Sequence, residues 1–301
     1  MTSKAREALT RGIEGLRAAS LSTEVRASDP AGEILRRGIA VSAFNLLETF
    51  VEGRLAEITA FVNQGALHFA DLPDRVQKQA TRNLLNVAAS RARRMQAPDV
   101  RLFVQSIGES LSAVSGAVNL SSLTWMWPGS NMGADDYAGI LRAFHVDKPW
   151  PSVAALSSRI GLAPGDPQQD LESFIRERHR AAHDASHQVS SLWIPLAIDM
   201  VVKFAVSVDT YASVGAAALR RGDAAYMADA NWTASVVGLR RVNQRATDWA
   251  EFKETGTRAV RRHSDRHVVT MHATNDCSDR DLLIVSDTAG QVIDWSVPAV
   301  G

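Results

Sequence analysis

The segment from residue 31 to residue 63 constrains the fold most, because its apolar side chains recur near helical spacing along its whole length. Asp29-Pro30 in front of it is a helix-start signal, and Asn63-Gln64-Gly65 ends the pattern. A second apolar run, Ser190–Leu219, predicts another long helix within 188–221, kinked or started at Pro195. The apolar positions of the first segment are Ile34, Ile39, Val41, Phe44, Leu47, Val51, Leu55, Ile58 and Val62. The sequence therefore predicts a mainly α chain.

Shorter elements complete the expected architecture. Periodicity and capping signals predict helices over 2–19, 72–95, 98–118, 135–144, 150–161 and 168–180. After Arg221-Gly222-Asp223 the pattern changes, and we expect a helix over 246–262, a strand over 267–272, and a hairpin of 282–285 with 292–295. The expected domains are an N-terminal helix (1–29), a helical bundle (30–222) and a small α+β appendage (232–301).

Composition limits the classes of partner. The chain has 301 residues and a formal net charge of zero, so a nucleic-acid site would have to be local. The single cysteine, Cys277, excludes an internal disulfide and a cysteine-based zinc site. We therefore expect the protein to be located in the reducing cytoplasm. The first residues mix both charges and predict no secretory signal. Charged residues interrupt the run 190–219, so we expect no membrane span and no membrane partner.

The stretch Arg178-His179-Arg180-Ala181-Ala182-His183 gathers cationic and titratable groups more densely than any other part of the sequence. RNA can be cut without a metal ion if its own 2′-hydroxyl attacks the adjacent phosphorus. Histidine can transfer the protons of that step, and arginine can fork onto the phosphate oxygens. We therefore take Arg178 and His183 as candidate catalytic residues. The candidate supporting residues are Glu177, His179, Asp184 and His187.

Two other interpretations of the stretch stay open. Arg178 can form a salt bridge with Glu172 or Glu177, while His183 caps a helix. Alternatively, the histidines at 179, 183 and 187 can bind a metal ion with Asp184. Each step of four residues rotates a side chain by about 40° around the helix axis. Three histidines spaced in this way cannot all point at one metal ion. We therefore expect no metal and no cofactor.

Three further residues are weaker candidates for RNA contact. Trp125 and Trp127 lie in a segment rich in Ser, Gly and Asn, where their rings can stack on bases or cover the edge of a core. Arg180 can add a phosphate contact beside Arg178.

The motif and its surroundings resemble the HEPN superfamily (higher eukaryotes and prokaryotes nucleotide-binding), which carries an R-[N/H/D]-x-x-x-H motif. Arg178 to His183 matches that motif, and His179 falls at its variable polar position. Residues 43–51 resemble the aromatic–Leu-Glu helix of prokaryotic members, and residues 129–150 resemble a spacer of the RiboL-PSP-type branch. The resemblance covers roughly residues 30–222. Asp184 departs from it, since relatives often carry glycine after the histidine.

The resemblance implies a HEPN-like helical bundle that dimerises. It further implies a metal-independent endoribonuclease of a toxin–antitoxin or phage-defence system, acting on an RNA substrate and held by an antitoxin or defence-system partner. Arg178 and His183 match the family's catalytic pair. The alternative that the resemblance leaves open is a non-catalytic HEPN-like nucleotide-binding or scaffold module, because some members keep the fold without activity.

Overall fold

The computed structural model describes residues 3–112 and 116–300, and its described residues are mainly helical, as predicted. Helix α3 (Pro30–Asn63) begins where Asp29 accepts a hydrogen bond from the Gly32 N–H, with proline in the first turn. Helix α10 (Trp193–Arg220) packs along α3, and every residue from Val201 to Leu219 is buried. Pro195 lies in the first turn of α10, so it starts this helix rather than kinking it.

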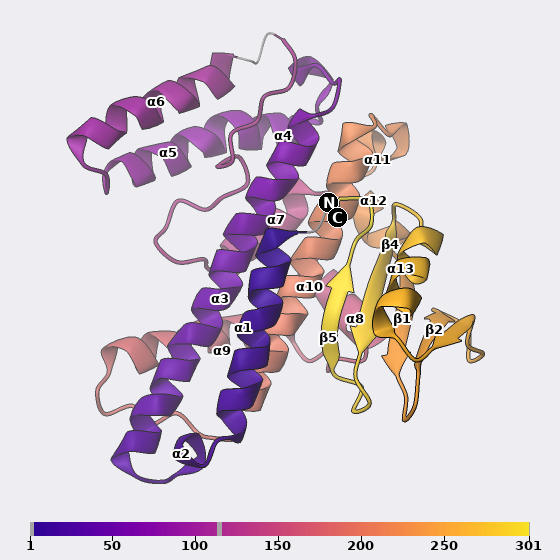
Figure 1. Ribbon diagram of the computed structural model, residues 1–301. Coiled ribbons are helices and arrows are strands. Elements are labelled where there is room, and N and C mark those ends of the chain that lie inside the picture. Colours follow the sequence, from indigo (N-terminus) through magenta and orange to yellow (C-terminus); the bar gives the residue numbers. More distant parts are fainter. Residues whose placement is uncertain (1–2, 113–115, 301) are drawn as a thin grey trace.

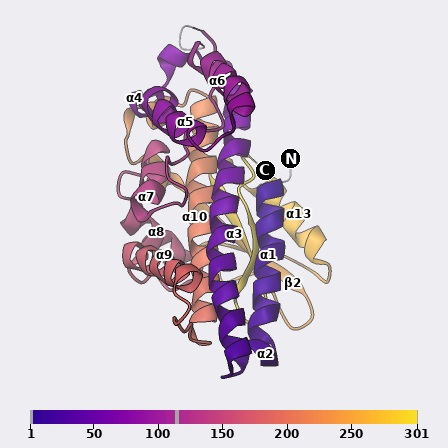
Figure 2. The same ribbon diagram turned by 90° about the vertical axis from the view of Figure 1, so that its left-hand side faces the viewer.

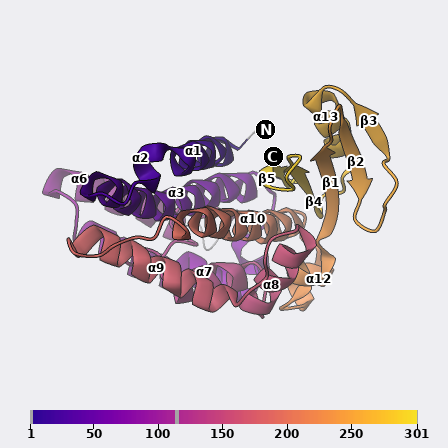
Figure 3. The ribbon, with the colours of Figure 1, turned by 90° about the horizontal axis from the view of Figure 1, so that it is seen from below.

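Other helices surround α10 (Figures 1 and 3). Helix α1 (Lys4–Leu21) packs on α3 and α10 through Leu9, Ile13 and Leu16. Helices α7 (Ala134–Ala143), α8 (Pro149–Arg159) and α9 (Pro167–His183) lie on the opposite side of α10 from α1 (Figure 3). The short helices α2 (Thr23–Arg26), α11 (Ala224–Ala228) and α12 (Trp232–Val236) complete this part of the fold.

Residues 74–112 form a helical arm at one end of the bundle (Figures 1 and 2). The expected helix over 72–95 is three consecutive helical segments: α4 (Asp74–Lys78), the π-helical turn η2 (Gln79–Asn83) and α5 (Leu84–Ala92). Helix α6 (Ala97–Ser112) follows, and part of the expected extension to residue 118 lies outside the described residues. A short 3₁₀ turn, η1 (Phe69–Asp71), leads into the arm. Ile107 is the only residue of α6 that is fully buried, so this helix is largely exposed.

The C-terminal unit is a five-stranded sheet of order β3-β2-β1-β4-β5. Its strands are β1 (Gly238–Gln244), β2 (Trp249–Lys253), β3 (Arg261–His263), β4 (Asp281–Ser286) and β5 (Val292–Ser296). Strands β1 and β4 are parallel, and the other pairs are antiparallel. The predicted hairpin is confirmed: β4 pairs with β5, and Gly290 in the connecting turn has a φ of +80°.

Two expectations for this unit are wrong. The segment 267–272 is helical, within α13 (Arg266–Asp276), because Asp265 caps the helix and Val269 and Ala273 bury one helical face against the sheet. The segment 246–262 contains β2 and β3 instead of a helix. Pairing with β1 buries Ala250 and Glu251, and Glu251 forms ion pairs with two arginines there, so tertiary pairing outweighs local helix propensity.

A buried ionic network fastens the sheet to the bundle. The Asp209 carboxylate on α10 accepts hydrogen bonds from Arg54 Nε (2.7 Å), Ser213 Oγ (2.9 Å) and Trp295 Nε1 (2.8 Å). Arg6 Nη1 of α1 lies 3.8 Å from the same carboxylate. Helices α1, α3 and α10 and strand β5 therefore meet at one side chain. Among the described helices, none is long and apolar enough to cross a membrane.

Candidate active site

The candidate motif occupies the C-terminal end of α9, which packs on α3. Arg178 is half-buried and points toward α3, where its guanidinium carbon lies 5.8 Å from the centre of the Phe44 ring. Its Nη2 donates to Asn131 Oδ1 at 3.1 Å and lies 3.4 Å from Asn45 Oδ1. The guanidinium is thus positioned by an aromatic face and two neutral amides.

The salt bridges that were considered for Arg178 do not form. Glu172 pairs with Arg176 at 3.6 Å, and Glu177 lies 2.8 Å from His187 Nε2. Within the described ranges, Arg178 has no ion pair with a carboxylate, and its buried Nε has no hydrogen-bond partner. Arg178 is therefore not ion-paired with Glu172 or Glu177, and its unpartnered donor, Nε, is buried against the bundle.

Glu48 is the acidic group whose charge acts on Arg178. Burial raises the pKa of Glu48, while the hydrogen bond from the Met132 N–H and the charge of Arg178 act in the opposite direction. The carboxylate is therefore an incomplete counterion for the guanidinium.

A surface hollow of about 380 Å³ opens beside Arg178. Three arginines at alternate positions of α9 line it: Arg176, Arg178 and Arg180. The side chains of Phe44 and Ile175 supply its apolar walls. Arg180 is exposed, so its guanidinium is accessible to a phosphate group. The hollow is large enough for a small anionic group and its immediate neighbours.

His183 is the last residue of α9 and is exposed. Its ring centre lies 4.6 Å from that of His179, which is also exposed. The next residue, Asp184, turns its carboxylate to the N–H and hydroxyl of Ser186, and these hydrogen bonds lower the pKa of Asp184. The Asp184 carboxylate is thus hydrogen-bonded to Ser186, and the His183 ring is accessible to solvent.

The chain does not bring Arg178 and His183 together. The sequence placed a helix end near residue 180, but α9 continues to His183. Five residues along an unbroken helix separate two side chains by about 140°. In the described part of the chain, Arg178 contacts α3 and the Asn131 loop, and the ring contact of His183 is with His179. One chain therefore presents the two groups on different sides of the helix.

Two arginines that the sequence reasoning missed fix the segment after the motif. Arg37 Nε donates to the Ala181 carbonyl at 3.1 Å, and Arg37 Nη1 donates to the Ala185 carbonyl at 3.1 Å. Arg36 is buried and donates to the Val189 carbonyl at 2.8 Å. The available signal was a pair of adjacent arginines near the start of an apolar helix, and this signal does not specify which backbone carbonyls they contact.

The expectation that Trp125 and Trp127 stack on bases is wrong. Their exposed fractions are 2% and 4%, and the Trp125 ring packs 4.7 Å from that of Phe144. Both rings belong to the hydrophobic core, which matches the other interpretation given to them above. The loop that carries them contributes Asn131 to the Arg178 site, and contributes no stacking surface from these two side chains.

The described residues contain no cluster of three or more possible metal ligands. His187 faces Glu177, and Asp184 faces Ser186, so the ligand set considered for a metal is dispersed.

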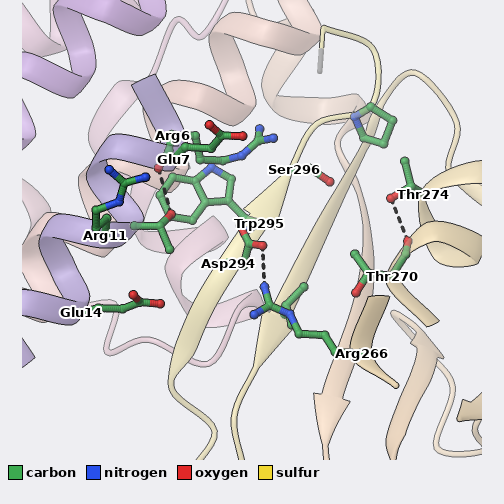
Figure 4. Close-up of a pocket in the computed structure, with 13 residues that line it drawn as sticks. Arg6, Glu7, Arg11, Glu14, Arg266, Thr270, Thr274, Asp294, Trp295 and Ser296 are labelled. Carbon is green, nitrogen blue, oxygen red and sulfur yellow. Dashed lines mark hydrogen bonds and ion pairs between the residues drawn. The ribbon is translucent and has the colours of Figure 1, made fainter. Parts of the chain in front are cut away.

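A larger cavity, of about 650 Å³, lies between α1, β5 and α13 (Figure 4). Three guanidinium groups and three carboxylates line it: those of Arg6, Arg11 and Arg266, and those of Glu7, Glu14 and Asp294. Arg266 is paired with Asp294, and Arg6 lies beside Asp209. The cavity therefore offers no excess charge to a phosphate, unlike the hollow beside Arg178.

Comparison of the chain with protein-family models, with curated proteins and with solved structures gave no match.

Proposed function

We propose that the chain is a metal-independent endoribonuclease of the HEPN type, built on a HEPN-like bundle over residues 30–222. The observation that supports it most is Arg178, a guanidinium without a paired carboxylate beside an open hollow, with an accessible imidazole five residues away. Such a cation is suited to a phosphate group, because guanidinium donors fork onto phosphate oxygens.

The reaction assigns separate roles to the two groups. The RNA 2′-oxygen attacks the adjacent phosphorus, the 5′-oxygen leaves, and a 2′,3′-cyclic phosphate forms. His183 transfers one of the two protons of the step, either from the 2′-hydroxyl or to the leaving 5′-oxygen, and water carries the other. Arg178 stabilises the negative charge that develops on the phosphoryl oxygens.

A homodimer is part of the proposal, because one chain holds the two groups on different sides of α9. In a twofold arrangement, Arg178 of one chain and His183 of the partner subunit face the same phosphate. The biological setting proposed is a toxin or phage-defence effector in the cytoplasm, silenced by an antitoxin or other defence-system protein.

The test is cleavage of a mixed-sequence RNA in EDTA by wild type, Arg178→Ala and His183→Ala proteins of equal thermal stability. We expect wild type to release products ending in 2′,3′-cyclic phosphate, and each variant to be slower by about 10²–10⁴-fold. A His183→Ala rate equal to that of wild type would refute the assigned role. Absence of cleavage by wild type, with dimer formation intact, would favour the non-catalytic HEPN-like scaffold.

A further inference from the structure

The helical arm carries a local excess of positive charge in a chain whose formal net charge is zero. Residues 74–101 contain seven arginine and lysine side chains against two aspartates. The cationic residues are Arg75, Lys78, Arg82, Arg91, Arg93, Arg94 and Arg101. A charge excess confined to one segment produces a local field that the neutral total conceals.

Most of this charge is not neutralised within the chain. Arg91 pairs with Glu52 at 2.7 Å, and Arg75 donates to the Arg142 carbonyl. Arg82, Arg93 and Arg101 are exposed and have no ion pair in the described ranges. Exposed guanidinium groups without an ion pair remain available to an anionic partner.

The end of the arm connects directly to the Arg178 site through one short loop. Ser90 Oγ of α5 donates to the Pro128 carbonyl, and Arg94 Nη2 lies 3.4 Å from the same oxygen. Three residues later, Asn131 accepts the hydrogen bond from Arg178. Because consecutive Cα atoms lie 3.8 Å apart, Pro128 and Asn131 are separated by at most about 11 Å. The Arg94 guanidinium and the Arg178 guanidinium therefore contact opposite ends of a four-residue loop.

We propose that Arg93 and Arg94 extend the Arg178 site into an auxiliary binding surface for the phosphate backbone of single-stranded RNA. That the polymer is RNA rests on the function proposed above. Recognition at this surface is by charge, since the tryptophans of the neighbouring loop are buried and offer no stacking platform. The surface accordingly strengthens binding of long substrates without selecting their sequence.

The first experiment measures binding apart from cleavage. A fluorescent single-stranded 2′-O-methyl RNA of mixed sequence cannot undergo 2′-hydroxyl attack, and its anisotropy gives the affinity across a NaCl series. We expect Arg93→Ala/Arg94→Ala protein to show a slope of log affinity against log salt that is shallower by about 1.4, at about 0.7 for each phosphate contact. Arg93→Lys/Arg94→Lys protein should keep most of the wild-type slope.

The matched control removes two other exposed arginines, Arg258 and Arg262 of the C-terminal unit. Arg258→Ala/Arg262→Ala protein changes the net charge equally and should keep the wild-type slope. An unchanged slope for Arg93→Ala/Arg94→Ala, or an equal change in the control, would overturn the proposal.

A second experiment varies the length of a cleavable RNA. Arg93→Ala/Arg94→Ala protein should cut a trinucleotide as fast as wild type, and should cut an RNA of about twenty nucleotides more slowly at limiting substrate. Equal rates on both lengths would refute the auxiliary surface and leave the proposed function standing. If the variant shows the shallower salt slope but wild type cuts no RNA, the proposed function is refuted and the arm remains a nucleic-acid surface.

Discussion

Replacing Asp209 with alanine tests whether the buried ionic network holds the C-terminal sheet on the bundle. The carboxylate is fully buried and accepts hydrogen bonds from Arg54, Ser213 and Trp295. Arg54 is also buried, with 2% of its side chain exposed. The substitution therefore leaves a buried guanidinium, a hydroxyl and an indole N–H without their common acceptor.

The expected loss follows from the buried charge. Removing one partner of a buried ion pair costs about 3–5 kcal/mol, because the other charge stays buried without compensation. Arg54 keeps its bonds to Glu57 and Ser213, so we expect the loss to stay within this range. With an unfolding entropy of about 2.1 cal/mol/K per residue, the melting temperature should fall by about 5–8 °C.

Urea and thermal unfolding, followed by circular dichroism and by tryptophan fluorescence, provide the assay. Trp295 contacts Asp209 directly, so its fluorescence also reports the state of the junction. Asp199→Ala is the control, since Asp199 lies on the same helix and is exposed, and it should change stability by less than about 0.5 kcal/mol. Equal, small losses in both variants would refute the view that Asp209 holds the two parts together.

Three further predictions concern single titratable groups. Burial opposes ionisation of Asp209, but Arg54, Arg6 and the hydrogen bonds outweigh it and lower its pKa. The stability it contributes is therefore complete above about pH 3.9 and is lost as pH falls through the folded pKa, so Asp209→Asn protein should lose less melting temperature than wild type on acidification. Burial, with the Asp281 charge, raises the pKa of Cys277 to about 12, so iodoacetamide should modify it far faster in urea than in the folded protein. Glu48→Gln removes a charge beside Arg178 and keeps an acceptor for Met132, so it should tighten 2′-O-methyl RNA binding by about 2–5-fold, and weaker binding would contradict the electrostatic argument.

Long elements with local signals could be predicted from the sequence. Helix α3 has a capping aspartate, a proline in its first turn and a sustained apolar pattern, and its predicted boundaries lie within two residues of those observed. The segment 267–272 was assigned wrongly because six alternating residues also fit a helical face, and only packing of Val269 and Ala273 on the sheet decides between them.

The surroundings of Arg178 could not be predicted, because they come from distant segments. Asn45 and Asn131 are 133 and 47 residues away in sequence, so no local pattern indicates that they contact one guanidinium. The burial of Trp125 likewise depends on Phe144, which belongs to the segment that ends α7. The motif itself was visible in the sequence, since its residue types and spacing are local.

The most direct test of the central claim is complementation between two inactive variants. Arg178→Ala and His183→Ala proteins are mixed, allowed to exchange subunits and assayed on RNA in EDTA. The proposal of a shared site predicts that the mixture recovers activity, because a mixed dimer holds one intact Arg178 facing one intact His183 of the partner subunit. A mixture as inactive as each variant alone, beside an active wild type, would contradict the shared site.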